Sequence, residues 1–213
     1  HTRYEVSNNA GQDICDIVNN EGFDFLLVGS GISMSDSPDD IAATRYRPSF
    51  YNRYFKRFKA PESWFYPGAL LKDKTKMFIA RSNCDVGVFI NRNFVKATNT
   101  LVVISSEEDL FLLDYTRTLL KATHGSVGIV AKMSTTTPGH DQILKELWDF
   151  VSSTPQTQLL PDKDLTPGLF NSYNFMLIGY NTWNDVSEHR KEALQKMPST
   201  LILNKNKRSS SDN

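Results

Sequence analysis

The residues that most often carry catalysis are few in this sequence and lie far apart. Its four histidines, His1, His124, His140 and His189, include no pair at helical spacing, and neither of the two cysteines lies near one of them. Zinc sites and nucleophilic catalytic motifs need such residues at short, fixed spacings. We therefore predict no enzyme activity, no catalytic residue and no metal site. A histidine before a glycine, as at His124, is typical of a helix end.

Two short turns have residue types that suit a small anionic ligand. Glycine and serine follow one apolar run at Gly29, Ser30 and Gly31, and Ser105, Ser106 and Glu107 follow another. Backbone N–H groups at such turns can hold a phosphate. The same residues also make ordinary turns and helix caps, and the acids after Ser106 suit the positive end of a helix. These six residues are the candidate ligand-binding residues, and turns and caps are the alternative.

A basic and aromatic segment runs from Arg45 to Lys59, with six basic residues and no acid. At helical spacing its aromatic side chains fall on one side and most basic ones on the other. Three interpretations remain open: a helix packed on its own domain, a dimer or interdomain contact, and contact with an anionic membrane surface or a membrane partner. The candidate contact residues are Arg45, Arg47, Phe50, Tyr54, Arg57 and Phe58.

The composition indicates a globular chain without a general affinity for nucleic acid. The 213 residues can bury a sizeable core, and 24 basic residues balance 24 acidic ones. No apolar run approaches the roughly 20 residues of a membrane span. Two buried thiols are the simpler interpretation of the cysteines, and one disulfide is the alternative. The absence of any Asn-x-Ser/Thr sequence favours a cytosolic location.

The elements that would position these residues follow an α/β pattern. Buried strands are predicted at 25–28, 86–90, 101–104, 127–131, 175–178 and 201–203. Amphipathic helices are predicted at 109–124 and 140–151, the second with Trp148 on its apolar face. A shorter helix-like stretch covers 12–19, and 153–170 has the three prolines of an irregular segment. Alternating strands and helices predict a parallel sheet with flanking helices.

Two stretches repeat in the same order along the chain. Residues 22–29 match 172–179, and 88–93 match 201–206. We infer two α/β halves, 1–98 and 99–207, followed by a tail at 208–213. The first half carries an insertion at about 33–67 and lacks a counterpart of the leading strands and helices of the second, so it is truncated at its front.

The motif Phe23-Asp24-Phe25-Leu26-Leu27-Val28-Gly29-Ser30-Gly31 resembles the late strand of universal stress protein domains, and 85–91 resembles their last strand. Two such halves in tandem resemble the cytosolic C-terminal region of monovalent cation/proton antiporters, namely plant CHX exchangers and fungal potassium/proton antiporters. There the second half opens with a strand, acidic residues and an amphipathic helix, and 101–120 is similar. The resemblance implies a universal-stress-protein-like α/β fold.

The resemblance also implies a role and a place in the cell. We expect a non-catalytic regulatory or assembly domain of a potassium/proton antiporter. It would lie on the cytosolic face of an endomembrane of Golgi or vacuolar type rather than the plasma membrane. Its partner would be the membrane-spanning part of the same polypeptide. A homodimer and a peripheral membrane contact are further expectations, and nucleic acid is not one.

The sequence departs from the pattern of the nucleotide-binding members. Nucleotide-binding universal stress proteins share an Asp at the end of the first strand. They also share a G-x-x-G-x9-G-S/T loop after the late strand. Here the first strand of the second half ends in Ile104-Ser105-Ser106, and Tyr180 to Trp183 follow Gly179 without another glycine. We therefore expect no cofactor. The alternative is a universal-stress-type protein that binds an adenine nucleotide.

Overall fold

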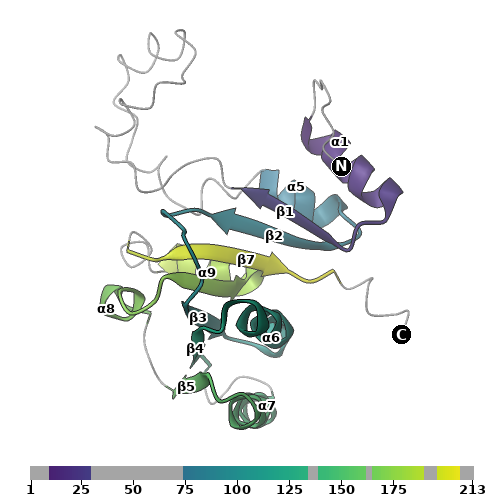
Figure 1. Cartoon of the computed structure of the whole chain (residues 1–213). Helices are drawn as coiled ribbons and strands as arrows, with labels where there is room; N and C mark the ends of the chain where they lie inside the picture. The colour runs from purple at the N-terminus through teal and green to yellow at the C-terminus, as the bar shows by residue number, and fades with distance from the viewer. Residues whose placement is uncertain (1–9, 30–73, 134–138, 162–164, 190–195, 207–213) are drawn as a thin grey trace.

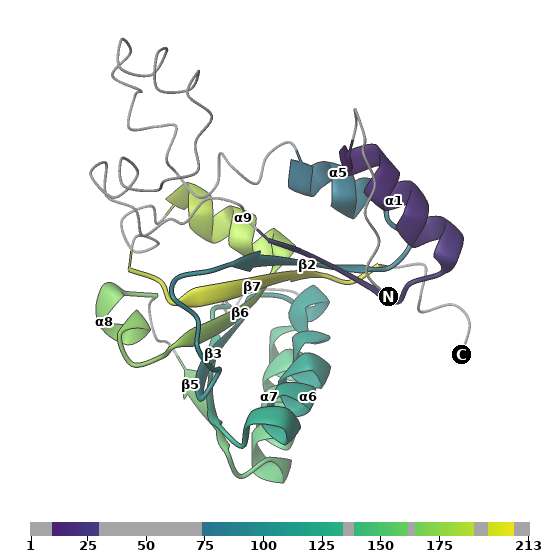
Figure 2. The same cartoon turned by 45° about the horizontal axis from the view of Figure 1, so that its top comes forward.

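The computed structural model describes residues 10–29, 74–133, 139–161, 165–189 and 196–206. These residues form one seven-stranded sheet covered by helices on both faces (Figures 1 and 2). The strands are β1 (Phe25–Gly29), β2 (Asp85–Ile90), β3 (Asn99–Ile104), β4 (Ser126–Ala131), β5 (Thr157–Pro161), β6 (Phe175–Gly179) and β7 (Ser199–Asn204). The helices are α1 (Ala10–Glu21), α5 (Lys74–Arg81), η2 (Glu107–Asp109), α6 (Leu112–Thr123), α7 (His140–Ser153), α8 (Pro167–Phe170) and α9 (Tyr180–His189).

The strand order is β1-β2-β7-β6-β3-β4-β5. Every neighbouring pair is parallel except β2 and β7, which are antiparallel. The predicted α/β fold with a parallel sheet is therefore confirmed, with one antiparallel junction that the sequence pattern did not indicate. The two predicted halves join at this junction into one continuous sheet.

The junction has approximate two-fold symmetry. Phe25 of β1 pairs with Asp85 of β2, and Phe175 of β6 pairs with Ser199 of β7, so Val88 is the counterpart of Ile202. These two residues also face each other across the antiparallel pair. An approximate two-fold axis thus passes through this pair, perpendicular to the sheet. The repeat at 22–29 and 172–179 has the right register, whereas the match of 88–93 with 201–206 is wrong by one residue.

The two faces of the sheet carry different helices. The face called here the α6 face bears Phe175, Leu177 and Val102, which pack with residues of α6 and α7. The opposite α9 face bears Val88 and Ile202, which pack with Trp183 of α9. Helices α1 and α5 also lie on the α9 face, through a small cluster built on Cys15, Phe78 and Val86 (Figure 2). Both faces of the central strands are buried, which explains their uninterrupted apolar runs.

The predicted helices are present, with two corrections. Helix α7 buries Ile143 and Leu147 as expected, but Trp148 is 53% exposed and Phe150 takes the buried place instead. Phe150 is covered because it packs against Arg117 of α6, whereas Trp148 lies outside the buried side of the helix. The segment 153–170 is not irregular, since β5 and α8 lie within it. Strand β5 pairs with β4 and ends on Pro161, at a sheet edge where a missing N–H costs least.

No helix in the described ranges has the length and apolar character needed to cross a membrane. The basic and aromatic segment with Arg45, Arg47, Phe50, Tyr54, Arg57 and Phe58 lies outside the described residues. So do the insertion at 33–67 and the tail at 208–213.

Candidate functional site

The carboxyl ends of β3, β6 and β7 lie side by side at one edge of the sheet. This is the edge where open α/β sheets usually bind ligands. The chain leaves β3 through Ser105 and Ser106 into the short helix η2, and it leaves β6 directly into α9. The site is built where these two turns meet.

A single carboxylate holds the two turns together. Asp109 is 2% exposed. Its Oδ2 accepts hydrogen bonds from Ser105 N at 2.9 Å, Ser105 Oγ at 3.1 Å, Ser106 N at 3.2 Å and Thr182 Oγ1 at 2.7 Å. The hydroxyls of Ser105 and Thr182 also contact each other. One oxygen therefore receives four donors, three from the turn after β3 and one from α9, and a buried carboxylate needs such donors.

The second oxygen of Asp109 lies against Gly179, the last residue of β6. A Cβ atom at Gly179 would overlap Asp109 Oδ1, so only glycine leaves room for the carboxylate here. Beside it, Asn181 Nδ2 donates to Glu108 Oε2 at 2.8 Å. Two acidic side chains of η2 thus contact the first turn of α9. Negative charge at a helix N-terminus is favourable, because the N–H groups there point outward.

A shallow hollow of about 300 Å³ opens next to this cluster. Acidic and amide groups form much of its wall, and Lys205 is the one basic residue among the described residues that line it. The lining residues are Glu107, Glu108, Asp109, Phe111, Gly179, Tyr180, Asn181, Leu203, Asn204, Lys205 and Asn206. The wall is better suited to a cation or to neutral hydrogen-bonding groups than to a phosphate.

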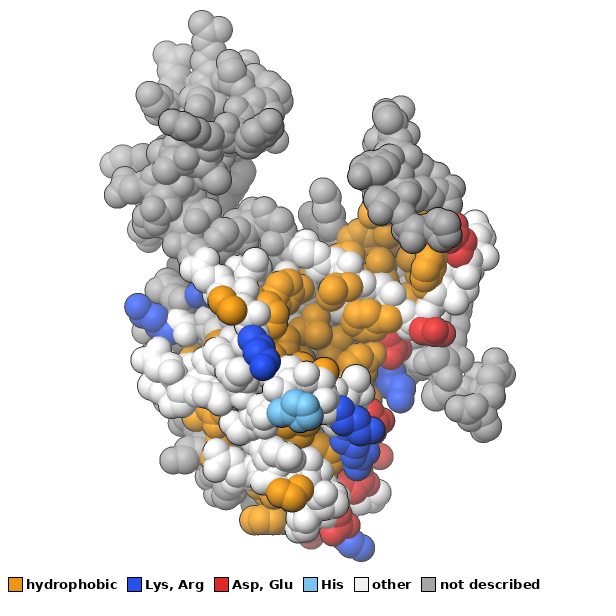
Figure 3. Space-filling model, viewed as in Figure 1, with side chains coloured by type: hydrophobic (Ala, Val, Ile, Leu, Met, Phe, Trp, Pro, Cys, Tyr) orange, Lys and Arg blue, Asp and Glu red, His pale blue; other side chains and the backbone are white. Residues whose placement is uncertain are grey.

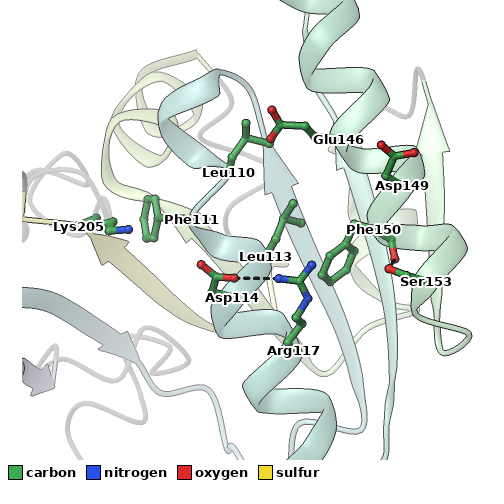
Figure 4. A pocket seen from close by; sticks show the side chains of 10 residues that line it. All are labelled: Leu110, Phe111, Leu113, Asp114, Arg117, Glu146, Asp149, Phe150, Ser153 and Lys205. Carbon is green, nitrogen blue, oxygen red and sulfur yellow. Dashed lines mark hydrogen bonds and ion pairs between the residues drawn. The ribbon is translucent and has the colours of Figure 1, made fainter. Parts of the chain in front are cut away.

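A second hollow, of about 500 Å³, lies between α6 and α7 (Figure 4). The Arg117 guanidinium carbon lies 4.9 Å from the centre of the Phe150 ring, and Arg117 Nη1 lies 3.0 Å from Asp114 Oδ1. Glu146 and Asp149 of α7 line the opposite wall. Arg117 already contacts the Phe150 ring and the Asp114 carboxylate. We therefore interpret this hollow as part of the contact between two packed helices, with charged side chains at its border.

The two halves are tied together at the same edge by Asp85. Tyr115 of α6 donates to Asp85 Oδ2 at 2.9 Å, and the Asn206 backbone N–H donates to Asp85 Oδ1 at 2.8 Å. Burial raises the pKa of Tyr115 well above its ordinary range, and the hydrogen bond to Asp85 adds to this. The hydroxyl therefore stays protonated and donating at physiological pH.

Sequence reasoning placed part of this site. Ser105 and Ser106 do lie at the end of β3, but their donors point at Asp109 rather than toward the hollow that Glu107 lines. Gly29 ends β1, which runs opposite to β3, so it lies at the other edge of the sheet. Ser30 and Gly31 lie outside the described residues. Gly29 is therefore not brought together with Ser105 and Ser106.

The residues that sequence reasoning missed are Asp109 as the centre of the cluster and Thr182 as its partner. In the sequence Asp109 is one of three consecutive acids at a predicted helix start. The available signal was the repeated glycine at position 179, directly followed by a helix. A glycine at a buried strand end indicates that something approaches the backbone closely.

The remaining reactive side chains have structural surroundings. His124 ends α6 in a left-handed conformation and its N–H donates to Leu120 O at 2.9 Å, so the predicted helix end is confirmed. Cys15 and Cys84 are free and buried, as the simpler interpretation had it. Burial raises the pKa of the Cys84 thiol, and the neighbouring Asp85 adds to this. Among the residues that the structure describes, no group of three or more His, Cys, Asp or Glu could hold a metal ion.

Comparison with known proteins gives a fold. No protein-family model and no curated protein matches the sequence. Among solved structures, a universal stress protein from Archaeoglobus fulgidus has a TM-score of 0.51 at 12% identity, over 92% of this chain and 66% of its own. A Pseudomonas aeruginosa protein described as a universal stress protein has a TM-score of 0.50 at 10% identity, over 96% and 70%.

The chain has a universal-stress-protein-like fold. The identities are too low to carry more than the fold. This chain spans about two thirds of the length of the Archaeoglobus fulgidus protein that it matches.

Proposed function

We propose that this chain is a non-catalytic regulatory or assembly domain with a universal-stress-protein-like fold. The observation that carries the proposal is Asp109. Its carboxylate, with the donors of Ser105, Ser106 and Thr182, fills the turn where this fold class has its usual ligand edge. Because these donors already bond to Asp109, they are not directed at a phosphate.

Charge supports the same conclusion. A phosphate at the first turn of α9 would meet the carboxylates of Asp109 and Glu108, which already contact Thr182 and Asn181 there. Like charges at such distances disfavour binding. The described hollows also offer no nucleophile paired with a base. An interaction role fits these features better than chemistry on a substrate does.

The finer proposal is that the domain belongs to a potassium (monovalent cation)/proton antiporter and lies on the cytosolic side of its membrane. It is supported by the tandem of two universal-stress-like halves and by the resemblance of 101–120 to the start of the second half in the C-terminal region of such antiporters. The domain would then bias the transporter between states by contacting one of them better than the other.

The test is transport by the polypeptide as its gene encodes it. In vesicles, removal of this domain should change the rate, regulation or amount of potassium/proton exchange without abolishing the exchange reaction. Asp109→Ala should act like removal, whereas Trp148→Ala, an exposed change on α7, should not. If the gene encodes no block of membrane-spanning helices, or if removal changes no exchange property, the antiporter proposal is wrong.

The second candidate is a universal-stress-type protein that binds an adenine nucleotide, and the names of the solved structures with this fold favour it. Calorimetry with ATP, AMP and adenosine decides between the two. We expect no saturable heat at about 1 mM ligand. A saturable one-to-one binding heat for any of the three would support the second candidate and contradict the first.

A further inference from the structure

Strand β1 is an edge strand whose counterpart is an interior strand. Within the described residues β1 pairs only with β2, whereas its symmetry counterpart β6 lies between β7 and β3. The sequences of the two strands are nearly the same, Phe-Leu-Leu-Val-Gly and Phe-Met-Leu-Ile-Gly. A strand of this composition is the kind that parallel sheets bury on both sides.

The exposure of equivalent side chains shows the difference. Leu177 of β6 is 2% exposed, but its counterpart Leu27 of β1 is 58% exposed. Phe175 is 5% exposed, and its counterpart Phe25 is only partly buried. All of β6 is buried, while no residue of β1 is. The same residues are thus covered in one half and open in the other.

The open side chains form one continuous apolar surface on the α6 face. Phe25 and Leu27 flank Gly87, where a Cβ would come within 2.6 Å of Phe25 Cζ and 3.3 Å of Leu27 Cδ1. The partly buried Phe89 and Leu201 continue it. Hydrophobic side chains gather over β1, β2 and β7 in Figure 3, which has the view of Figure 1. Natural sheets rarely leave an edge and a face of this kind uncovered.

The second half shows what covers such a surface. Strand β3 pairs in parallel with β6, and helix α6 follows β3 and packs Leu112, Leu113 and Leu120 on the cluster that holds Phe175 and Leu177. Around Phe25 and Leu27, the described residues supply only the rim of this cover. Tyr115 of α6 reaches across, with its ring centre 6.0 Å from that of Phe25.

We propose that the open edge of β1 receives a parallel strand, and that the surface formed by Phe25, Leu27 and Phe89 receives the amphipathic helix that follows this strand. The unit is an equivalent of β3 and α6. It is supplied by polypeptide on the amino-terminal side of α1.

Chain order identifies this source. In the second half the strands β3, β4 and β5 and the helices α6 and α7 all precede β6, and only α8 and α9, on the other face, flank it directly. In the first half α1 precedes β1 and α5 is the next described helix after it, and both lie on that same face. The counterparts of β3 and α6 therefore belong before α1, joined by right-handed crossovers.

A second copy of this chain cannot lend the unit. Its own β3 and α6 are already buried in its core, with Val102 and Leu112 both at 0% exposure. Lending them would unfold the donor. A second copy could cover the surface only by packing its own open surface against it, and the experiment separates that outcome.

The experiment compares the polypeptide as its gene encodes it with residues 1–213 expressed alone. Leu27→Cys is labelled with a maleimide, and Val95→Cys, at a position that is 93% exposed between β2 and β3, is the matched control. The native Cys15 and Cys84 are buried and give the background rate in the unsubstituted protein. In residues 1–213 alone both introduced thiols should react at similar rates.

In the encoded polypeptide the thiol at position 27 should react at least about tenfold more slowly, whereas the thiol at position 95 should keep its rate. Equal rates at position 27 in both proteins would overturn the proposal. So would protection at position 27 in residues 1–213 alone. If protection of the position-27 thiol in residues 1–213 rises with protein concentration, a second copy covers the surface. If this protection is the same at every concentration, another part of the 213 residues covers it.

A charge substitution gives an independent readout. Leu27→Asp should leave the thermal unfolding midpoint of residues 1–213 unchanged within error, because the side chain is already largely in water. In the encoded polypeptide the same substitution should lower the midpoint of this domain, with Val95→Asp as the neutral control. A drop in both proteins, or in neither, would contradict the proposal.

Discussion

The cluster around Asp109 makes a prediction that a pair of substitutions can test. Asp109→Ala removes an acceptor that serves two backbone N–H groups and two hydroxyls. The hydroxyls of Ser105 and Thr182 keep each other as partners, so the main loss is at the two N–H groups. A buried donor without an acceptor costs about 1–3 kcal/mol. Because Ser105 and Ser106 are only partly buried, we expect a total of about 2–4 kcal/mol.

Gly179→Ala acts on the same contact from the other side. The added methyl group would overlap Asp109 Oδ1, and overpacking of this kind costs about 1–3 kcal/mol. When Asp109→Ala is already present, the overlapping oxygen is gone and the methyl group fills part of the space. The cost of Gly179→Ala should then fall below about 1 kcal/mol, which gives a coupling energy of about 1–2 kcal/mol.

The assay is urea unfolding of residues 1–213 and of the two single variants and the double variant, followed by circular dichroism and Trp fluorescence. Equal slopes of the unfolding free energy against urea are the control that the denatured states are comparable. Additive costs, or an Asp109→Ala variant within about 0.5 kcal/mol of the parent chain, would refute the account of this cluster.

Other predictions follow from single side chains. Tyr115→Phe should cost about 1 kcal/mol by removing the hydrogen bond to Asp85, measured by urea unfolding. Because the pKa of Tyr115 is raised in the folded chain, the unfolded chain loses this proton at a lower pH than the folded chain does. The free energy of unfolding should therefore fall above about pH 10, and it should fall less steeply in Tyr115→Phe. A fall of equal slope in both proteins would contradict this. Phe150→Ala should cost about 3–4 kcal/mol, while Trp148→Ala should cost about 1 kcal/mol or less, and the reverse order would show that α7 is rotated.

Much of the fold could be predicted because buried parallel strands are apolar on both faces and therefore read as uninterrupted runs. Leu101 to Ile104 and Phe175 to Ile178 are of this kind, and both are strands at those positions. The sequence does not predict strand β5, because this edge strand lies between prolines and has the composition typical of a loop. Trp148 was misplaced because its helical position lies only slightly off the buried stripe, and α6 decides which side chain is covered.

The repeat also carried information that the sequence could not fully use. Gly29 and Gly179 end equivalent strands, but only the second has Asp109 against it, because the segment that contains Asp109 has no described counterpart in the first half. Asp109 itself gave no distinct signal, since three consecutive acids at a helix start have a sufficient local explanation in the helix dipole. Its role depends on Thr182, which lies 73 residues away in sequence and meets it only in the folded sheet.

The central claim is that Asp109 takes up the donors that would otherwise serve a ligand at this edge of the sheet. Its most direct test is the ¹H–¹⁵N spectrum of residues 1–213 during titration with ATP and Mg²⁺ to about 1 mM. The amide signals of Ser105 and Ser106 should stay unchanged in the parent chain and move strongly in Asp109→Ala without any ligand. Saturable shifts of these two signals when ATP is added to the parent chain would contradict the claim.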